Sequence, residues 1–250
     1  MKAKISCTLG EVRIDLSKPM DCSLPLSPGE NTPRAWYVDP VKFSPVVMGD
    51  WIGDVNQGGD VNFKDVEFNP HGNGTHTECV GHISKEGHTI NQSLKTFWFT
   101  VKLASIQAQD LKNGDQVFTK KQFESNLGTE PVEAFMVRTL PNDSEKRHKN
   151  HSNTNWPYVL EEAAVFLRER GIQHYLTDLP SVDREQDEGK LLAHHAFWNY
   201  PENPREEATI SEMLFIPNSI PDGIYLLNIQ IASFELDASP SKPILYRIES

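Results

Sequence analysis

The chain has 250 residues, of which 38% are hydrophobic, so it is long enough to bury a sizeable core. Its formal net charge of -11 disfavours nucleic acids and anionic membrane surfaces as partners, and no stretch approaches the roughly 20 apolar residues of a membrane span. Three widely spaced cysteines, and an N-terminus without the apolar run of a secretory signal, favour a reducing compartment, and we expect a cytoplasmic protein.

The first half of the chain predicts loops followed by a strand, a helix and a strand. Residues 22–69 are rich in Pro, Gly, Asp and Asn, which predicts long loops and short strands that are either functional or only surface. Apolar side chains alternate along residues 97–106 and predict a half-buried strand. A short helix is predicted over residues 120–127, with Thr119 as its cap, and a strand over residues 132–140.

The clearest helix is predicted over residues 156–170. Asn155 precedes it as a possible cap, an apolar stripe runs along it, and Gly171 can end it in the left-handed conformation. A strand is predicted directly afterwards, over residues 172–177. Strand, helix and strand in this order are typical of parallel units in which helices pack on a sheet.

The last part of the chain returns to strands, which we predict over residues 210–216, 223–234 and 244–248. Together the elements predict a mixed α/β fold class with a strand-rich core. The length and the continuous pattern predict one domain over residues 1–250.

Side chains that bind metals are concentrated in residues 71–82, His-Gly-Asn-Gly-Thr-His-Thr-Glu-Cys-Val-Gly-His. Because residues two apart point the same way in an extended chain, His76, Glu78 and His82 fall on one face. Two imidazoles and a carboxylate suit zinc, manganese or iron. His71 has the wrong parity, but the Gly-Asn-Gly that follows it can bend the backbone back toward that face. The alternative is a polar turn that happens to be rich in histidine.

A second group of candidate ligands lies far downstream. Residues 178–183, Asp-Leu-Pro-Ser-Val-Asp, follow a predicted parallel strand, where open sheets usually carry their sites. His194 and His195 come next, and surface histidines are the alternative interpretation for them. Glu212 lies in an apolar run, where a buried carboxylate must be paired, protonated or metal-bound, unless it faces solvent from an edge strand.

Other reactive or aromatic side chains carry weaker signals. Cys79 has the opposite parity from Glu78, and a small buried residue is a better interpretation of it than an activated nucleophile. Trp51, Trp98 and Trp198 are candidate walls of an aromatic pocket, although core packing is the commoner role for such residues.

At these histidines the sequence resembles the cyclase family that includes bacterial kynurenine formamidase and isatin hydrolase. The family motif is His-x-Gly-Thr-His-x-Asp-x-Pro-x-His, and residues 74–82, Gly-Thr-His-Thr-Glu-Cys-Val-Gly-His, match most of it. Weaker likenesses follow in the order expected for the family, at residues 12–17, 178–183, 193–195, 211–213 and 236–243.

The resemblance implies a compact, swivelling β/β/α-type domain that forms a homodimer or a homotetramer and binds one or two divalent metal ions, most simply Zn or Mn. Carried over by position, it implies a catalytic histidine at His82 and metal ligands at His76, Glu78, His194 and Glu212. The gap before the last of these ligands is longer than usual, which leaves His195 as an alternative to His194.

Three departures from the motif lie at the site itself. Gly72 stands where the motif has its first histidine, and His71 lies one place early. Either His71 supplies this metal ligand or the ligand is lost. Glu78 replaces the usual Asp and is a methylene longer, and Val80 replaces the usual Pro.

The predicted function is that of a hydrolase that cleaves an amide, formamide or cyclic amide C–N bond of a small molecule. A metal-activated water would attack the carbonyl, with His82 as general base. One alternative is a metal-dependent lyase, dehydratase or cyclase, in which His82 takes a proton from carbon and product analysis shows no net hydrolysis. Another is a non-catalytic metal-binding or small-molecule-binding protein, which would be inactive on a broad panel of amides, lactams and lactones.

Overall fold

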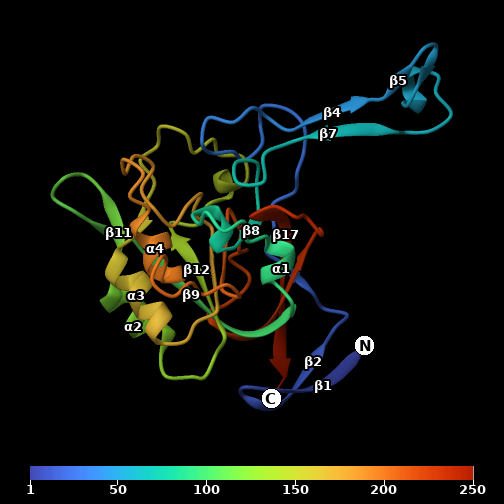
Figure 1. Ribbon diagram of the computed structural model, residues 1–250. Helices are drawn as coiled ribbons and strands as arrows, with labels where there is room; N and C mark the ends of the chain where they lie inside the picture. The colour runs from blue at the N-terminus through green and yellow to red at the C-terminus, as the bar shows by residue number, and fades with distance from the viewer. Residues whose placement is uncertain (250) are drawn as a thin grey trace.

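The computed structural model describes residues 1–249 as a strand-rich body from which one long hairpin projects (Figure 1). The helices are α1 (Ile90–Ser93), α2 (Lys120–Leu127), α3 (Glu161–Glu169) and α4 (Leu192–Trp198), and 3₁₀ turns cover Val55–Gln57, Val80–His82 and Ser144–Arg147. The strands are β1 (Lys2–Cys7), β2 (Gly10–Asp15), β3 (Met20–Asp21), β4 (Lys42–Pro45), β5 (Val47–Met48), β6 (Trp51–Ile52), β7 (Lys64–Glu67), β8 (His76–Glu78), β9 (Trp98–Gln107), β10 (Gln109–Asp110), β11 (Gln116–Phe118), β12 (Ala134–Leu140), β13 (Tyr158–Val159), β14 (His174–Thr177), β15 (Thr209–Glu212), β16 (Gly223–Ile231) and β17 (Ala238–Glu249).

The main sheet closes on itself like a barrel. Its strands follow the order β17, β16, β9, β12, β14, β15 and β8, and β8 pairs with both β15 and β17. The pairs of β9 with β12, β12 with β14, and β14 with β15 are parallel, as the strand–helix–strand pattern predicts. Short β8 therefore lies where the two ends of the sheet meet, and it carries two of the predicted metal ligands, His76 and Glu78.

Two hydrophobic cores lie on opposite faces of the parallel strands. Along β12, Phe135 and Val137 belong to the core that includes Phe123 and Leu167 from the helices, whereas Ala134 and Met136 belong to the other core. This alternation is the period-2 pattern of a strand that is buried on both faces. Helices α2, α3 and α4 cover one face (Figure 1), so the predicted mixed α/β fold class is confirmed.

The long central helix begins later than the sequence predicts. Asn155 has a φ of 46° and does not cap a helix, and Trp156 is 2% exposed, with its indole N–H donating to the carbonyl of Asp183. Residues Tyr158–Val159 pair with β11 as a strand. The tertiary contacts of Trp156 and of this short strand override the helical pattern until Glu161.

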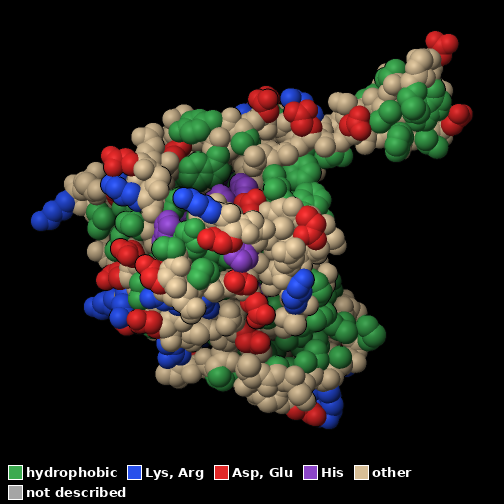
Figure 2. Space-filling view, viewed as in Figure 1, with side chains coloured by type: hydrophobic (Ala, Val, Ile, Leu, Met, Phe, Trp, Pro, Cys, Tyr) green, Lys and Arg blue, Asp and Glu red, His purple; other side chains and the backbone are tan. Residues whose placement is uncertain are grey.

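Residues 42–67, here called the arm, form the projecting hairpin. Strands β4 and β7 pair in antiparallel register, and β5 and β6 lie toward the tip (Figure 1). The long loops and short strands predicted for this region are confirmed. Hydrophobic side chains gather on the arm (Figure 2), and those that are large and exposed are Phe43, Val47, Met48, Val55, Val61, Phe63 and Val66.

None of the helices within residues 1–249 combines the length and the apolar character that crossing a membrane requires.

Candidate metal centre

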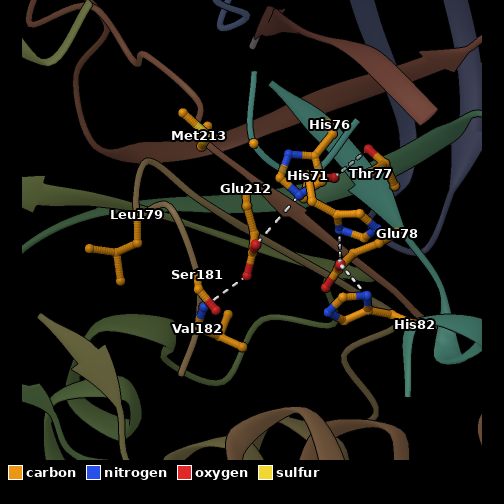
Figure 3. Close-up of polar contacts among 12 residues, drawn as sticks. His71, His76, Thr77, Glu78, His82, Leu179, Ser181, Val182, Glu212 and Met213 are labelled. Carbon is orange, nitrogen blue, oxygen red and sulfur yellow. Dashed lines mark hydrogen bonds and ion pairs between the residues drawn. The ribbon is translucent and has the colours of Figure 1, made fainter. Parts of the chain in front are cut away.

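Strand β8 places two candidate ligands on one face and a third across from them. His76 lies opposite Glu212 of β15, and Glu78 lies opposite Ile210. His76 and Glu78 are two residues apart, and both are fully buried. Nε2 of His76 lies 3.5 Å from Oε2 of Glu212 (Figure 3). Strand parity therefore puts His76 and Glu78 on one face, and cross-strand pairing puts Glu212 beside His76.

His71 reaches the same point through the glycine-rich turn. Gly74 has a φ of 123°, a conformation that side-chain-bearing residues rarely adopt. A Cβ at Gly72 would lie 2.6 Å from a methyl group of Val38, so this close approach also requires glycine. The turn places Nδ1 of His71 3.0 Å from Oε2 of Glu78. The bend thus brings His71 to the site despite its strand parity. This agrees with the alternative in which His71, and not the residue at position 72, supplies the ligand.

His194 enters the cluster from α4. Its Nε2 lies 3.1 Å from Oε1 of Glu78, and its Nδ1 lies 2.5 Å from Oδ2 of Asp183. Oε1 of Glu212 accepts a hydrogen bond of 2.8 Å from the backbone N–H of Val182 (Figure 3). The loop predicted to lie at the carboxyl edge of the parallel strands therefore orients both distal side chains.

His195, the alternative to His194, lies outside the cluster. Its Nδ1 is 3.1 Å from the carbonyl oxygen of Tyr200, and its ring packs against the ring of that tyrosine. Successive residues of a helix differ in direction by about 100°. The helix that turns His194 toward Glu78 therefore turns His195 away from it.

His82 lies at the rim of the cluster. It ends the 3₁₀ turn Val80–His82 and is 30% exposed, against 1% for Glu78. Its Nδ1 is 3.2 Å from Oδ2 of Asp237 and 3.9 Å from Oε2 of Glu78. This histidine is placed to meet both solvent and the buried carboxylate.

The cluster attracts positive charge. Burial lowers the pKa of His71, but hydrogen bonds to Asp237 and Glu78 outweigh it and raise the value to about 10. Burial also opposes the rise in the pKa of His194, which the two carboxylates beside it hold well above its usual range. Burial alone would raise the pKa of Glu78, yet the charge of His82 and the contacts from the other two histidines hold it well below its usual range. The buried carboxylates thus require cationic partners.

The residues present fit a divalent cation. Nε2 of His76 is buried at the centre and has no hydrogen-bond partner among residues 1–249, and the buried Oε2 of Glu78 lies 3.0 Å from Nδ1 of His71. The ligand atoms of His71, His76 and Glu78 lie within 4.8 Å of one another, as do those of Glu78, His82 and His194. Imidazole nitrogens and carboxylate oxygens are the ligands that zinc and manganese accept. Because Glu78 belongs to both groups, the donor set suits one ion or two neighbouring ions.

Comparison with known proteins identifies the family. The family model described as Putative cyclase matches residues 14–184. The chain belongs to this cyclase family. The match includes the whole histidine segment but ends before α4, so the distal candidate ligands rest on the geometry above.

Relatives and solved structures agree with the family. Kynurenine formamidase of Bacillus cytotoxicus is 25% identical over 233 residues, which cover 93% of this chain and 96% of that protein. Kynurenine formamidase of Bacillus cereus (strain ATCC 10987) is 26% identical over 234 residues, with the same coverage of 93% and 96%. A potential metal-dependent hydrolase with cyclase activity has a TM-score of 0.66 at 18% identity, covering 93% of this chain and 99% of that one. An isatin hydrolase bound to the product analogue thioisatinate has a TM-score of 0.64 at 14% identity, covering 93% of each chain. The family that the histidine motif resembles is confirmed.

Two aspartates contact the clustered histidines, and sequence patterns assign neither of them an individual role. Asp183 accepts hydrogen bonds from both the ring and the backbone N–H of His194, and Asp237 contacts His71 and His82. Both lie in segments that resemble the cyclase family, residues 178–183 and 236–243. That position was the available signal, but no spacing rule connects either aspartate to a particular histidine.

The remaining candidates pack as ordinary core or surface residues. Cys79 is fully buried, and burial raises the pKa of its thiol, so it is not activated. Trp198 is fully buried behind His194, whereas Trp98 lies on the surface against Tyr246. Trp51 lies on the arm against Phe63.

Proposed function

We propose that this member of the cyclase family is a metal-dependent hydrolase that cleaves an amide, formamide or cyclic amide C–N bond of a small molecule. The observation that carries the proposal is the buried, unpartnered Nε2 of His76 next to the fully buried carboxylate of Glu78, inside a ring of histidines and carboxylates. The reaction class is supported by relatives named kynurenine formamidase and by structural neighbours named isatin hydrolase.

The residues that would hold the cation are His71, His76, Glu78, His194 and Glu212. Zinc and manganese are the proposed metals, because the donors mix imidazole nitrogen with carboxylate oxygen. When bound, a divalent ion supplies Lewis acidity that polarises a carbonyl and lowers the pKa of water. Asp183 fixes the ring of His194, which helps to keep this donor set in one geometry.

His82 is the proposed general base. It is the most exposed of the clustered histidines, and its position at the rim lets it meet a substrate that enters from solvent. It would take a proton from the attacking water and then protonate the leaving nitrogen. Nε2 is the nitrogen available for this transfer, because Nδ1 faces Asp237.

We further propose that the protein acts as one domain in a homodimer or homotetramer in the cytoplasm. The candidate site collects side chains from residue 71 to residue 237, which favours a single folding unit. An isolated two-stranded ribbon is marginal in water, so the exposed apolar side chains of the arm favour burial against another copy. The three cysteines are all unpaired, which suits a reducing compartment.

The test is a turnover screen of zinc-loaded and manganese-loaded protein on aryl formamides, cyclic amides and lactones, run in ¹⁸O-labelled water. We expect one label to enter the product carboxylate or formate, because hydrolysis adds water across the bond. A product without label that has lost a proton or water would assign the chain to lyase or cyclase chemistry. Inactivity of metal-replete protein on the whole panel would contradict the proposal.

A further inference from the structure

One carboxylate oxygen contacts two of the clustered histidines. Oδ2 of Asp237 lies 2.8 Å from Nε2 of His71 and 3.2 Å from Nδ1 of His82. The two imidazole rings lie almost face to face, with centroids 4.3 Å apart and planes 31° apart. Asp237 is therefore a common acceptor for two histidines to which different roles are proposed.

This arrangement determines where each neutral ring carries its proton. A neutral imidazole has one N–H, and an ionised carboxylate only accepts hydrogen bonds. In His82 the ring nitrogen that faces Asp237 is Nδ1, which must therefore be the protonated one, and the lone pair is left on Nε2. Both ring nitrogens of His71 face a carboxylate, so its proton lies on Nε2, toward Asp237, when a cation takes the lone pair of Nδ1 beside Glu78.

The backbone holds Asp237 in place independently of its side chain. The loop between β16 and β17 carries it, and its carbonyl accepts a hydrogen bond of 3.0 Å from the N–H of Cys79. A Cβ at Gly81 would lie 2.0 Å from the carbonyl oxygen of His88 and 3.3 Å from Cβ of Asp237. Glycine at this position therefore lets the turn that ends at His82 pack closely against the loop.

We propose that Asp237 is a positioning residue that selects the tautomers of His71 and His82. It directs Nδ1 of His71 toward the cation-binding group and leaves Nε2 of His82 as the nitrogen that accepts the proton. The roles of the two histidines and the tautomer of His71 rest on the proposed function, whereas the tautomer of His82 follows from its hydrogen bond to Asp237. Partners of this kind around metal-binding histidines are typically worth 10–100-fold in metal affinity or activity.

The tautomers can be measured without any substrate. In zinc-loaded protein with ¹⁵N-labelled histidines, the nitrogen shifts report which ring nitrogen is protonated, and His82→Gln assigns the His82 signals. We expect the Nδ1–H tautomer for His82 in the wild type, and a shift toward the Nε2–H form in Asp237→Ala. An Nε2–H tautomer in the wild type, or an unchanged tautomer in the variant, would overturn the proposal. The wild-type spectrum decides by itself if the variant does not fold.

Kinetics then separate positioning from substrate binding. At saturating zinc we expect Asp237→Ala to lose about 10–100-fold in kcat with little change in KM, and Asp237→Asn, which keeps an acceptor oxygen, to recover part of the loss. Combining Asp237→Ala with His82→Ala should cost less kcat than the product of the two single losses, since the part of the effect of Asp237 that acts through His82 is already lost in His82→Ala. A raised KM with unchanged kcat would assign Asp237 to substrate binding instead.

The matched control is Glu235→Gln in the same loop. Glu235 is exposed and bonds Thr89 and Asn91, away from the histidines, so this variant should keep wild-type kcat. If the wild type hydrolyses nothing, the proposed function fails, while the ¹⁵N measurement still tests the role of Asp237.

Discussion

The arm, residues 42–67, and the histidine segment, residues 71–82, follow one another in the chain and bury opposite kinds of side chain. The arm exposes large apolar residues such as Phe63 and Val66, which are each 54% exposed. The histidine segment buries His76 and Glu78 completely, and leaves Nε2 of His76 without a hydrogen-bond partner among residues 1–249. Exposed apolar side chains and buried polar side chains both cost free energy in an isolated chain in water.

We therefore propose a different kind of partner for each region. A buried carboxylate and an unpaired imidazole nitrogen call for a cation, whereas a thin apolar ribbon calls for another protein surface. We therefore expect variants of the histidine segment to change metal content and turnover. Variants of the arm should change assembly before they change chemistry.

The largest effect is expected for His76→Ala. It removes a proposed metal ligand whose Nε2 lies at the centre of the cluster, so metal and turnover should be lost together. The matched control is His148→Ala, an exposed histidine outside the cluster, which should keep both. Metal analysis and an activity assay on the two proteins check this, and a metal-replete His76→Ala protein would remove His76 from the ligand set.

The His82→Ala variant should show whether His82 is a metal ligand or the general base. Because His82 lies at the rim, we expect the variant to keep its fold and its metal content. Turnover should fall by roughly 10²–10⁴-fold, the usual cost of removing a general base. Loss of metal in parallel with activity would instead make His82 a ligand, an outcome that its place in a second candidate group allows.

The sequence predicts the centre of the site better than its edges. His76, Glu78 and Glu212 follow from strand parity and from an acid in an apolar run, both of which are local properties. The orientation of His194 rather than His195 depends on how α4 sits on the sheet. The meeting of Asp237 with His82 depends on the pairing of β8 with β17, which joins residues far apart in sequence.

The fold shows the same division between local and tertiary information. The parallel strands and the helix that packs on them have clear periodic patterns, and the structure confirms them. The start of that helix is shifted because Trp156 is held by the carbonyl of Asp183, a contact about which the helical pattern holds no information. Closure of the sheet through β8 is likewise invisible in a segment of three residues.

The stability that His71 gives the metal-free protein should decrease as the pH rises. The pKa of His71 is raised from 6.5 to about 10 in the folded metal-free chain. Its contribution to stability is therefore fully present below about pH 6.5 and is lost as the pH rises through about 10. Melting temperatures of the chelated protein should fall over this window more steeply than those of chelated His71→Ala. Equal slopes would show that His71 does not bear this charge.

The smallest effect on turnover is expected for the arm. Replacing Phe63 and Val66 with Lys puts charge on an apolar surface, so the proposed oligomer should dissociate toward monomers while metal content stays unchanged. The control is Asp65→Lys, which changes an exposed polar residue of the same strand. Sedimentation or light scattering measures the outcome, and an unchanged oligomer would show that the arm lies outside the interface.

The metal content of freshly purified protein, measured by elemental analysis together with the melting temperature, tests the central claim most directly. We predict one or two divalent ions per chain, and a lower melting temperature after chelation that zinc or manganese restores. At free metal 100-fold above its Kd, binding contributes about 2.7 kcal/mol of stability, and each kcal/mol moves the melting temperature of a chain of this size by about 2–4 °C. Protein without metal, and with no thermal response to added ions, would contradict the account.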